Sequence, residues 1–246
     1  MTYHAVSAAM RHKVRRQLKD VEQRYGVRVL YACESGSRGW GFASPDSDYD
    51  VRFLYVHPLE WYLRVDPPRD VIELPIDDEL DVCGWEWRKA LGLLKGANPT
   101  LIEWLDSPVV YQQDDATVQA LKNVIPHWFS PVRARWHYYS MARKNFRGYL
   151  QGERVRLKKY FYVLRPLLAV RWVEAGKGVP PMRFDELLAG SELEAGQAEN
   201  GPRRPLLHAF IQSELLRGAI PPALPESRSG DVRELDRLLM TTVVGN

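Results

Sequence analysis

Two short motifs near the start of the chain combine residue types that suit phosphate and metal chemistry. Gly36-Ser37 is followed, after ten residues, by Asp48-Tyr49-Asp50. A glycine lets a phosphate approach the main chain closely, and a serine adds a hydroxyl and an amide donor. Aspartates two positions apart on a strand point to the same face, and Mg²⁺ prefers such carboxylate oxygens. The segment is therefore a candidate site for a triphosphate and divalent metal ions.

Ordinary surface structure is the alternative interpretation of the same residues. Asp48 and Asp50 could begin a solvated strand after the Ser-Pro-Asp turn that precedes them. Glu34 and Asp46 are expected to be turn or cap residues rather than metal ligands. Arg38 has two open interpretations, because it could add charge near the β- and γ-phosphates or form a structural ion pair with Asp46.

Strands have to position the two motifs, and the apolar pattern predicts them. Residues 27–33 and 49–56 read as strands, and residues 71–76 and 79–85 as a hairpin or extended pair. Gly26 is expected to end the first helix, and Asn98-Pro99 to begin another. The predicted helices cover residues 5–25, 85–95, 116–124, 132–150, 154–175 with a kink near Pro166, and 231–243, besides the one from Asn98.

This order of elements predicts an α+β protein with a small mixed sheet followed by a mainly helical part. We expect a catalytic domain over residues 1–115 and a helical basic domain over residues 116–246. Residues 190–205 are polar and rich in turn formers, and are predicted to be a mobile loop.

Composition excludes several classes of protein. Hydrophobic content of 45% and charged content of 26% are typical of a globular chain. No apolar run approaches the roughly 20 residues of a membrane span, and the N-terminus lacks a signal-peptide core. The two cysteines, Cys33 and Cys83, form no metal-binding spacing. We therefore expect a cytoplasmic protein with reduced thiols, no structural zinc and no membrane partner.

Charge is distributed unevenly although the net charge is only +3. Residues 44–115 contain 16 Asp or Glu and 6 Lys or Arg, whereas residues 126–175 contain 11 Lys or Arg, 2 Glu and 11 aromatic residues. Such asymmetry is typical of a chain in which one part binds metal and another binds phosphate-rich partners. Opposite charges that stabilise an interface between the two parts are the alternative.

The two motifs together carry a family resemblance. Gly36-Ser37 and Asp48-Tyr49-Asp50, between two strands, resemble the signature of the DNA polymerase beta nucleotidyltransferase superfamily. The wider run GSRGWGFASPDSDYDVRFLYV resembles the predicted nucleotidyltransferases named for an RNA repair pathway. The likeness extends over roughly residues 25–185, through LDVCGWEWRKAL, NPTLIEWLDSP and KKYFYVLRPLLAVRW. Gly39 departs from the small alanine-like residue that is common there.

The resemblance implies a palm-like catalytic domain, an NTP substrate and two Mg²⁺ or Mn²⁺ ions on carboxylates. It assigns Asp48 and Asp50 as metal ligands and Gly36, Ser37 and Arg38 as nucleotide-binding residues. A third carboxylate has to come from a neighbouring strand. Asp81, between two apolar residues, is the chosen candidate, and its rivals Asp77, Asp78 and Glu79 read as turn residues.

The basic segment 154–172 is a candidate for phosphate contact. Arg154, Lys158, Phe161 and Arg165 fall on one face of an expected helix, with leucines on another face. We predict that Lys158 and Arg165 contact the nucleotide or the acceptor backbone, the alternative being a solvated helix face.

Three functions remain open at this point. The first is transfer of a nucleoside monophosphate to a hydroxyl of a nucleic-acid end, with RNA favoured by the family name and by the basic aromatic segment. The second is modification of a protein or small molecule, as in the shorter antitoxin-type members of the superfamily. The third is a non-catalytic module that binds nucleotide or RNA.

Overall fold

The computed structural model describes residues 6–77, 79–152, 155–191, 204–226 and 228–246. Two compact units make up the chain. The first unit contains Met1–Trp128 together with Ser229–Asn246, and the second contains Phe129–Arg228. The sequence-based division at residue 115 differs from these units, because the helix that follows residue 115 and the last helix of the chain both belong with the sheet.

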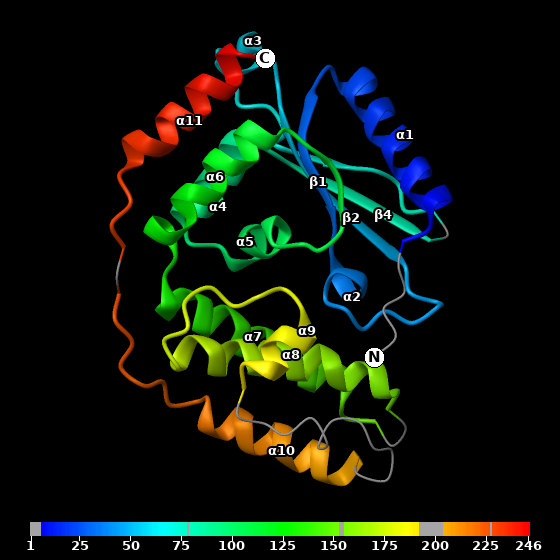
Figure 1. Ribbon diagram of the computed structural model, residues 1–246, viewed down its shortest axis with the longest axis vertical. Coiled ribbons are helices and arrows are strands. Elements are labelled where there is room, and N and C mark those ends of the chain that lie inside the picture. The colour runs from blue at the N-terminus through cyan, green and yellow to red at the C-terminus, as the bar shows by residue number, and fades with distance from the viewer. Residues whose placement is uncertain (1–5, 78, 153–154, 192–203, 227) are drawn as a thin grey trace. The chain divides into compact units, whose positions relative to one another are not determined.

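A five-stranded mixed sheet forms the centre of the first unit (Figure 1). Its strands lie in the order β3-β4-β2-β1-β5, with β2 parallel to β4 and the other neighbours antiparallel. This arrangement confirms the predicted α+β class and the predicted pair at residues 71–85. The strands are β1 (Arg28–Glu34), β2 (Tyr49–Val56), β3 (Val71–Glu73), β4 (Leu80–Glu86) and β5 (Val110–Gln113).

Helix α1 (Ala8–Tyr25) packs on one face of this sheet. The Ser7 side chain caps its start by accepting from the Met10 N–H, and Gly26, with φ of 61°, ends it as expected. The buried side chains of α1 lie three or four residues apart and pack against alternate residues of β2. The buried set includes Met10, Val14, Leu18 and Val21 on α1 and Val51, Phe53 and Tyr55 on β2.

Helices α4 (Trp87–Lys95), α5 (Pro99–Leu105) and α6 (Asp115–Trp128) lie on the side of the sheet away from α1 (Figure 1). Helix α11 (Val232–Val244) packs against α4 and α6. The predicted start of α5 is confirmed, since the Asn98 side chain accepts from the Thr100 N–H and Pro99 is the first helical residue. The short helices α2 (Gly36–Gly39) and α3 (Leu59–Tyr62) also belong to this unit.

The second unit is helical and has α8 (Leu157–Glu174) as its most enclosed element. Contacts with three other helices surround α8, and every residue from Val163 to Val170 is buried. A helix that is covered all round has no free face over that stretch. The surrounding helices are α7 (Pro131–Tyr149), α9 (Phe184–Ala189) and α10 (Arg204–Arg217).

The cationic face predicted for residues 154–172 is therefore wrong at Arg165. This side chain is 1% exposed and its Nε donates to the carbonyl of Met182 at 2.9 Å. Lys158 lies half-buried in the first turn of α8, and Arg154 lies outside the described residues. Helix α8 continues through Pro166.

The predicted loop at residues 190–205 lies largely outside the described residues, which resume at residue 204 with α10. Among the helices described, none has both the length and the apolar character that a membrane crossing requires.

Candidate active site

Asp50 and Asp81 lie side by side on parallel strands. They are register partners of β2 and β4, one residue after the start of each strand. Their neighbours Val51 and Val82 point into the core beneath α1, so both carboxylates point to the opposite face. Each side chain remains about a third exposed, at 31% and 33%. The strand register thus brings together two of the three predicted carboxylates where solvent and a ligand can reach them.

Arg52 joins these two carboxylates. Its Nη2 lies 3.2 Å from Asp50 Oδ1 and 2.7 Å from Asp81 Oδ2, and its Nη1 donates to the carbonyls of Val51 and Asp81 at 3.0 and 3.1 Å. Burial acts to lower the pKa of Arg52, but the Asp81 hydrogen bond and the two carboxylate charges raise it overall, so the guanidinium stays charged. Sequence reasoning missed this residue, although its place two positions after Asp50 put it on the same strand face.

Asp48 precedes β2 and has an exposed side chain. Across the described parts of the chain, no three His, Cys, Asp or Glu side chains lie close enough together to bind one metal ion. The Asp48 side chain therefore does not form a three-carboxylate site with Asp50 and Asp81. Its carbonyl accepts from Arg38 Nε at 3.3 Å. The assignment of Asp48 as a ligand stays a prediction that requires its side chain to turn toward the other two.

The main chain at Gly36 passes directly against the Asp50 carboxylate. Gly36 has φ of 56°, and a Cβ built there would lie 1.9 Å from Asp50 Oδ2. The preceding Ser35 N–H donates to the Asp50 carbonyl at 2.8 Å, which fixes the loop to the strand. Only glycine allows this approach, so the first motif shapes the carboxylate site as well as any phosphate site. Ser37 is buried, with 3% of its surface exposed.

Arg38 holds the segment that leads into β2. Its Nη2 donates to the Ser47 carbonyl at 2.6 Å, and its guanidinium carbon lies 3.9 Å from the centre of the Tyr49 ring. The side chain is 6% exposed. These contacts are with main chain and with an aromatic ring, and no ion pair with Asp46 is among them, whereas contact of Arg38 with a phosphate stays a prediction. They give Arg38 a role in positioning Asp48.

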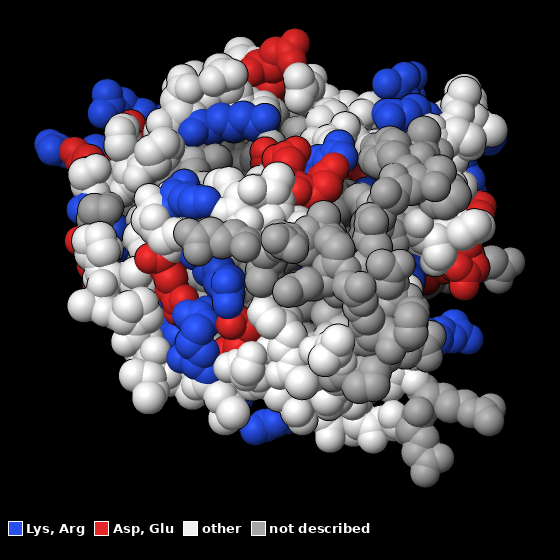
Figure 2. Space-filling view, turned by 60° about the horizontal axis from the view of Figure 1, so that its bottom comes forward, with Lys and Arg blue, Asp and Glu red and all other residues white. Residues whose placement is uncertain are grey.

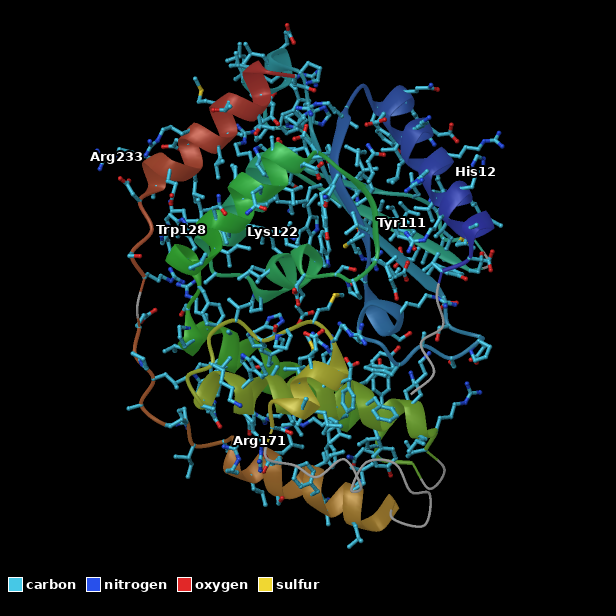
Figure 3. The ribbon with its side chains drawn as sticks, viewed as in Figure 1. His12, Tyr111, Lys122, Trp128, Arg171 and Arg233 are labelled. Atoms are coloured by element: carbon cyan, nitrogen blue, oxygen red, sulfur yellow. The ribbon has the colours of Figure 1, made fainter. Side chains whose placement is uncertain are left out.

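Glu34 is a buried neighbour of the site rather than a turn or cap residue. It ends β1, and its Oε1 accepts from the Asp50 N–H at 2.9 Å. The hydroxyl of Tyr111, labelled on β5 in Figure 3, donates to its other carboxylate oxygen. Burial raises the pKa of Glu34 to about 7, although both hydrogen bonds favour the charged form. The expectation for Glu34 was wrong because its partner Tyr111 lies 77 positions away in the sequence.

The rivals of Asp81 have other partners. Lys13 on α1 lies 3.1 Å from Asp77 Oδ2 and 3.5 Å from Glu79 Oε1. Asp77 Oδ1 also accepts from the Leu80 N–H at 3.0 Å, as a turn residue does. Asp78 lies outside the described residues. Of the described candidates, Asp81 alone is a register partner of Asp50.

The donor set at Asp50 and Asp81 fits a divalent cation. One oxygen of each carboxylate already converges on a single cationic nitrogen of Arg52, so the pair can share one positive centre. Mg²⁺ typically binds through one or two carboxylates together with substrate phosphates and waters. Asp50 and Asp81, with Asp48 if it turns inward, are the residues that would hold Mg²⁺ or Mn²⁺.

Comparison with known proteins identifies the family of the chain. The model of the RNA repair pathway DNA polymerase beta family matches residues 10–241. The uncharacterized protein YcgL of Bacillus subtilis (strain 168) is 44% identical over 251 residues, covering 95% of this chain and 96% of that protein. A solved nucleotidyltransferase-like protein from Exiguobacterium sibiricum 255-15 is 12% identical in sequence, and its alignment covers 94% of this chain and 76% of that protein. The TM-score of 0.31 is too low to support an argument. Since the family match spans nearly the whole sequence, the chain belongs to the RNA repair pathway DNA polymerase beta family.

Proposed function

We propose that the protein is a metal-dependent nucleotidyltransferase that moves a nucleoside monophosphate from an NTP to a hydroxyl at an RNA end. The observation that carries this proposal is the register pair Asp50–Asp81, with the Gly36 main chain packed against the first carboxylate. Family membership supports the reaction class. The words "RNA repair pathway" in the family description and the basic, aromatic segment 126–175 support RNA as the acceptor.

The reaction joins the acceptor oxygen to the α-phosphorus of the NTP, breaks the bond to the β-phosphate and releases pyrophosphate. The Gly36-Ser37 loop would face the phosphates, because its main chain lies beside the carboxylate pair. Asp81 would orient the acceptor hydroxyl and take up its proton. Divalent ions, when bound, would supply charge neutralisation for the triphosphate and for the leaving group.

Arg52 supports a second candidate, a nucleotide- or RNA-binding module without transfer activity. Its guanidinium already neutralises Asp50 and Asp81, and such a paired arrangement can be purely structural. Under the first proposal, Arg52 has to give up at least one of these contacts when the carboxylates take a metal ion. The two candidates therefore differ in whether Arg52 can release Asp50 or Asp81 to a metal ion.

One assay separates the candidates. The protein is incubated with each of the four α-³²P-labelled NTPs, Mg²⁺ or Mn²⁺, and an RNA oligonucleotide with a free or blocked 3′ hydroxyl. Label that enters only the unblocked RNA supports the proposal. Label on protein would favour modification of a polypeptide, and NTP binding without any transfer would favour the binding module.

A further inference from the structure

Strand β4 has one buried face and one partly open face along its whole length. Every second residue from Leu80 to Glu86 is buried, and the residues between them are partly exposed. The partly exposed residues are Asp81, Cys83 and Trp85. They share one face of the sheet, because successive side chains of a strand point to opposite faces. The open face of β4 is therefore the face that holds Asp81 of the carboxylate pair.

On β2, the open surface ends sooner than on β4. Asp50 and Arg52 are partly exposed, but the last four residues of the strand are buried. The register pairs Arg52 with Cys83 and Leu54 with Trp85. The carboxylate pair and Trp85 thus lie at opposite ends of one continuous surface, about 13 Å apart at the usual rise of a strand. This surface, called the β4 strip, consists of Asp50, Arg52, Asp81, Cys83 and Trp85.

Trp85 ends the β4 strip with an aromatic ring that is supported on one side. Its ring stacks on that of Trp104, with centres 3.8 Å apart and planes 26° apart. Trp104 is buried on α5, and its carbonyl accepts from the Tyr31 hydroxyl on β1 at 2.6 Å. On the other side of β4, Trp85 has Val71 of the short edge strand β3 as its register partner. Because Trp85 and Val71 are both partly exposed, a ligand can reach the indole from the edge of the sheet.

Charge pairs alone do not distinguish the β4 strip from other parts of the surface. Figure 2 shows Lys or Arg groups beside Asp or Glu groups at several places on the face that it presents. Arg171 and Glu214 of the second unit form such a pair at 2.6 Å. The strip adds a supported aromatic ring on the same strand face as two carboxylates. Carboxylates suit metal-bound phosphates and an aromatic ring suits a planar base, and phosphates and base are the two ends of a nucleotide.

We propose that Trp85 stacks on a nucleobase whose phosphate end lies at the Asp50–Asp81 pair. Stacking on an aromatic side chain tolerates any sequence because every base has a π face, so the site is expected to accept all four bases. The base belongs either to the NTP or to the terminal nucleotide of the RNA acceptor, since both bring a base close to the site of transfer. This inference rests on the proposed function and deepens it by assigning the residue that holds the base.

The first test compares ligands with and without a base on the full-length protein. Titration calorimetry with Mn²⁺ measures the affinity of each NTP, of inorganic tripolyphosphate, and of an oligouridine 12-mer with a normal or an abasic 3′-terminal nucleotide. Trp85→Ala should weaken binding of the base-containing ligand about tenfold through lost stacking and leave its base-free counterpart unchanged, whereas Trp85→Phe should retain affinity. Trp136→Ala is the matched control and should change no affinity, because Trp136 is a 41% exposed tryptophan of the second unit.

Cys83 provides a second measurement that needs no substitution. It lies between Asp81 and Trp85 on the open face and is partly exposed, whereas Cys33, the other cysteine of the chain, is buried. A nucleotide that extends from the carboxylates to Trp85 covers Cys83. Labelling of this thiol by 5,5′-dithiobis(2-nitrobenzoate) should therefore slow about tenfold at a ligand concentration about ten times the Kd, because few sites are then empty.

The outcomes separate the sources of the base and the two proposals. A loss confined to the NTPs assigns the stacked base to the NTP, and a loss confined to RNA assigns it to the acceptor. Equal weakening of base-containing and base-free ligands by Trp85→Ala would overturn the inference, as would Cys83 labelling that neither NTP nor RNA slows. If Trp85→Ala does not fold, the labelling of the wild type decides.

This inference and the proposed function can fail independently. Base-dependent binding through Trp85 without any transfer of label would leave the inference standing while the proposed function fails. Transfer at the wild-type rate by Trp85→Ala, measured at NTP and RNA concentrations below their KM values, would refute the inference alone.

Discussion

Arg52 is the positive partner of the carboxylate pair in the metal-free protein. Asp50 and Asp81 sit opposite each other on adjacent strands, where two like charges repel. The guanidinium offsets that repulsion through one nitrogen that contacts both carboxylates. A divalent ion would provide the same compensation with a higher charge. Arg52 is therefore expected to stabilise the metal-free protein and to compete with metal binding.

Replacing Arg52 by methionine should expose this competition. We expect Arg52→Met to lower the free energy of unfolding by about 1–2 kcal/mol without metal, because partly exposed carboxylates lose their charged partner. Mn²⁺ should then raise the melting temperature of the variant more than that of the wild type. Differential scanning fluorimetry over a Mn²⁺ series measures both effects. The double variant Arg52→Met, Asp81→Asn is the control and should recover metal-free stability, whereas equal Mn²⁺ shifts in wild type and Arg52→Met would contradict the role given to Arg52.

Glu34 makes stability depend on pH. Burial raises its pKa from the ordinary value of 4.5 to about 7, so between these pH values the folded state binds more protons than the unfolded state. The stability that Glu34 contributes is therefore complete below about pH 4.5 and is lost as pH rises through 7, by up to about 3 kcal/mol. Urea unfolding at pH 5, 6, 7 and 8 should show this decline in the wild type.

Glu34→Gln should remove that part of the pH dependence. Glutamine stays neutral throughout the range, so its altered hydrogen bond with Tyr111 changes the level of stability but adds no slope. A decline of the same size in Glu34→Gln and wild type would show that Glu34 does not titrate in this range.

At the scale of elements, the loop between β1 and β2 connects the two sequence motifs. Gly36 has a positive φ of 56° and faces Asp50, whereas Gly41 has a positive φ of 88° and a Cβ placed there would meet nothing within 4 Å. Both positions strain an L-residue, but only the first also collides with the carboxylate. Comparing substitutions at the two glycines therefore separates the effect of backbone strain from the effect of contact with the Asp50 carboxylate.

Alanine at these two glycines should have different consequences. Gly41→Ala should cost about 1 kcal/mol of stability from backbone strain alone. Gly36→Ala should cost roughly 1–3 kcal/mol more and should abolish Mn²⁺-dependent NTP binding, because the Asp50 carboxylate has to move. Thermal unfolding and titration calorimetry with NTP measure the two effects. Equal losses in both variants would mean that the Gly36–Asp50 contact is irrelevant to the site.

Sequence patterns predicted the elements whose signals are local. The strands β1, β2 and β4 follow from apolar runs, and α1 and α5 from their terminal residues Gly26 and Asn98. Strand β5 was missed because VYQQ is short and half polar, and its pairing with β1 is a long-range contact. Arg165 was misplaced because a helical wheel shows one helix at a time, whereas burial of α8 is imposed by three neighbours.

The same limit applies to the candidate site. Spacing within the chain, together with the family resemblance, selected Asp48, Asp50 and Asp81 as candidates and placed the last on a neighbouring strand. The partners Glu34–Tyr111 and Arg52–Asp81 join residues 77 and 29 positions apart, so they depend on strand order and register. No local pattern contains that information.

At the scale of the whole molecule, the uneven charge of the sequence corresponds to different chemistry in the two units. The first unit contains the carboxylate pair, and the second contains a network of Arg–Glu ion pairs. Under the proposed function, the carboxylate pair of the first unit would carry out the transfer, and the basic second unit would offer cations to the acceptor. Transfer of a nucleotide to RNA is the activity that would need both.

The rate at which label from an α-³²P-NTP enters RNA in the wild type, Asp81→Asn and Glu79→Gln tests the central claim most directly. We predict that Asp81→Asn lowers the rate at least about 100-fold while the protein stays folded, because a ligand and proton acceptor of the transferring site is lost. Glu79→Gln, which changes the same charge two positions earlier and pairs with Lys13, should retain the wild-type rate. Wild-type transfer by Asp81→Asn would contradict the assignment of the Asp50–Asp81 pair as the active site.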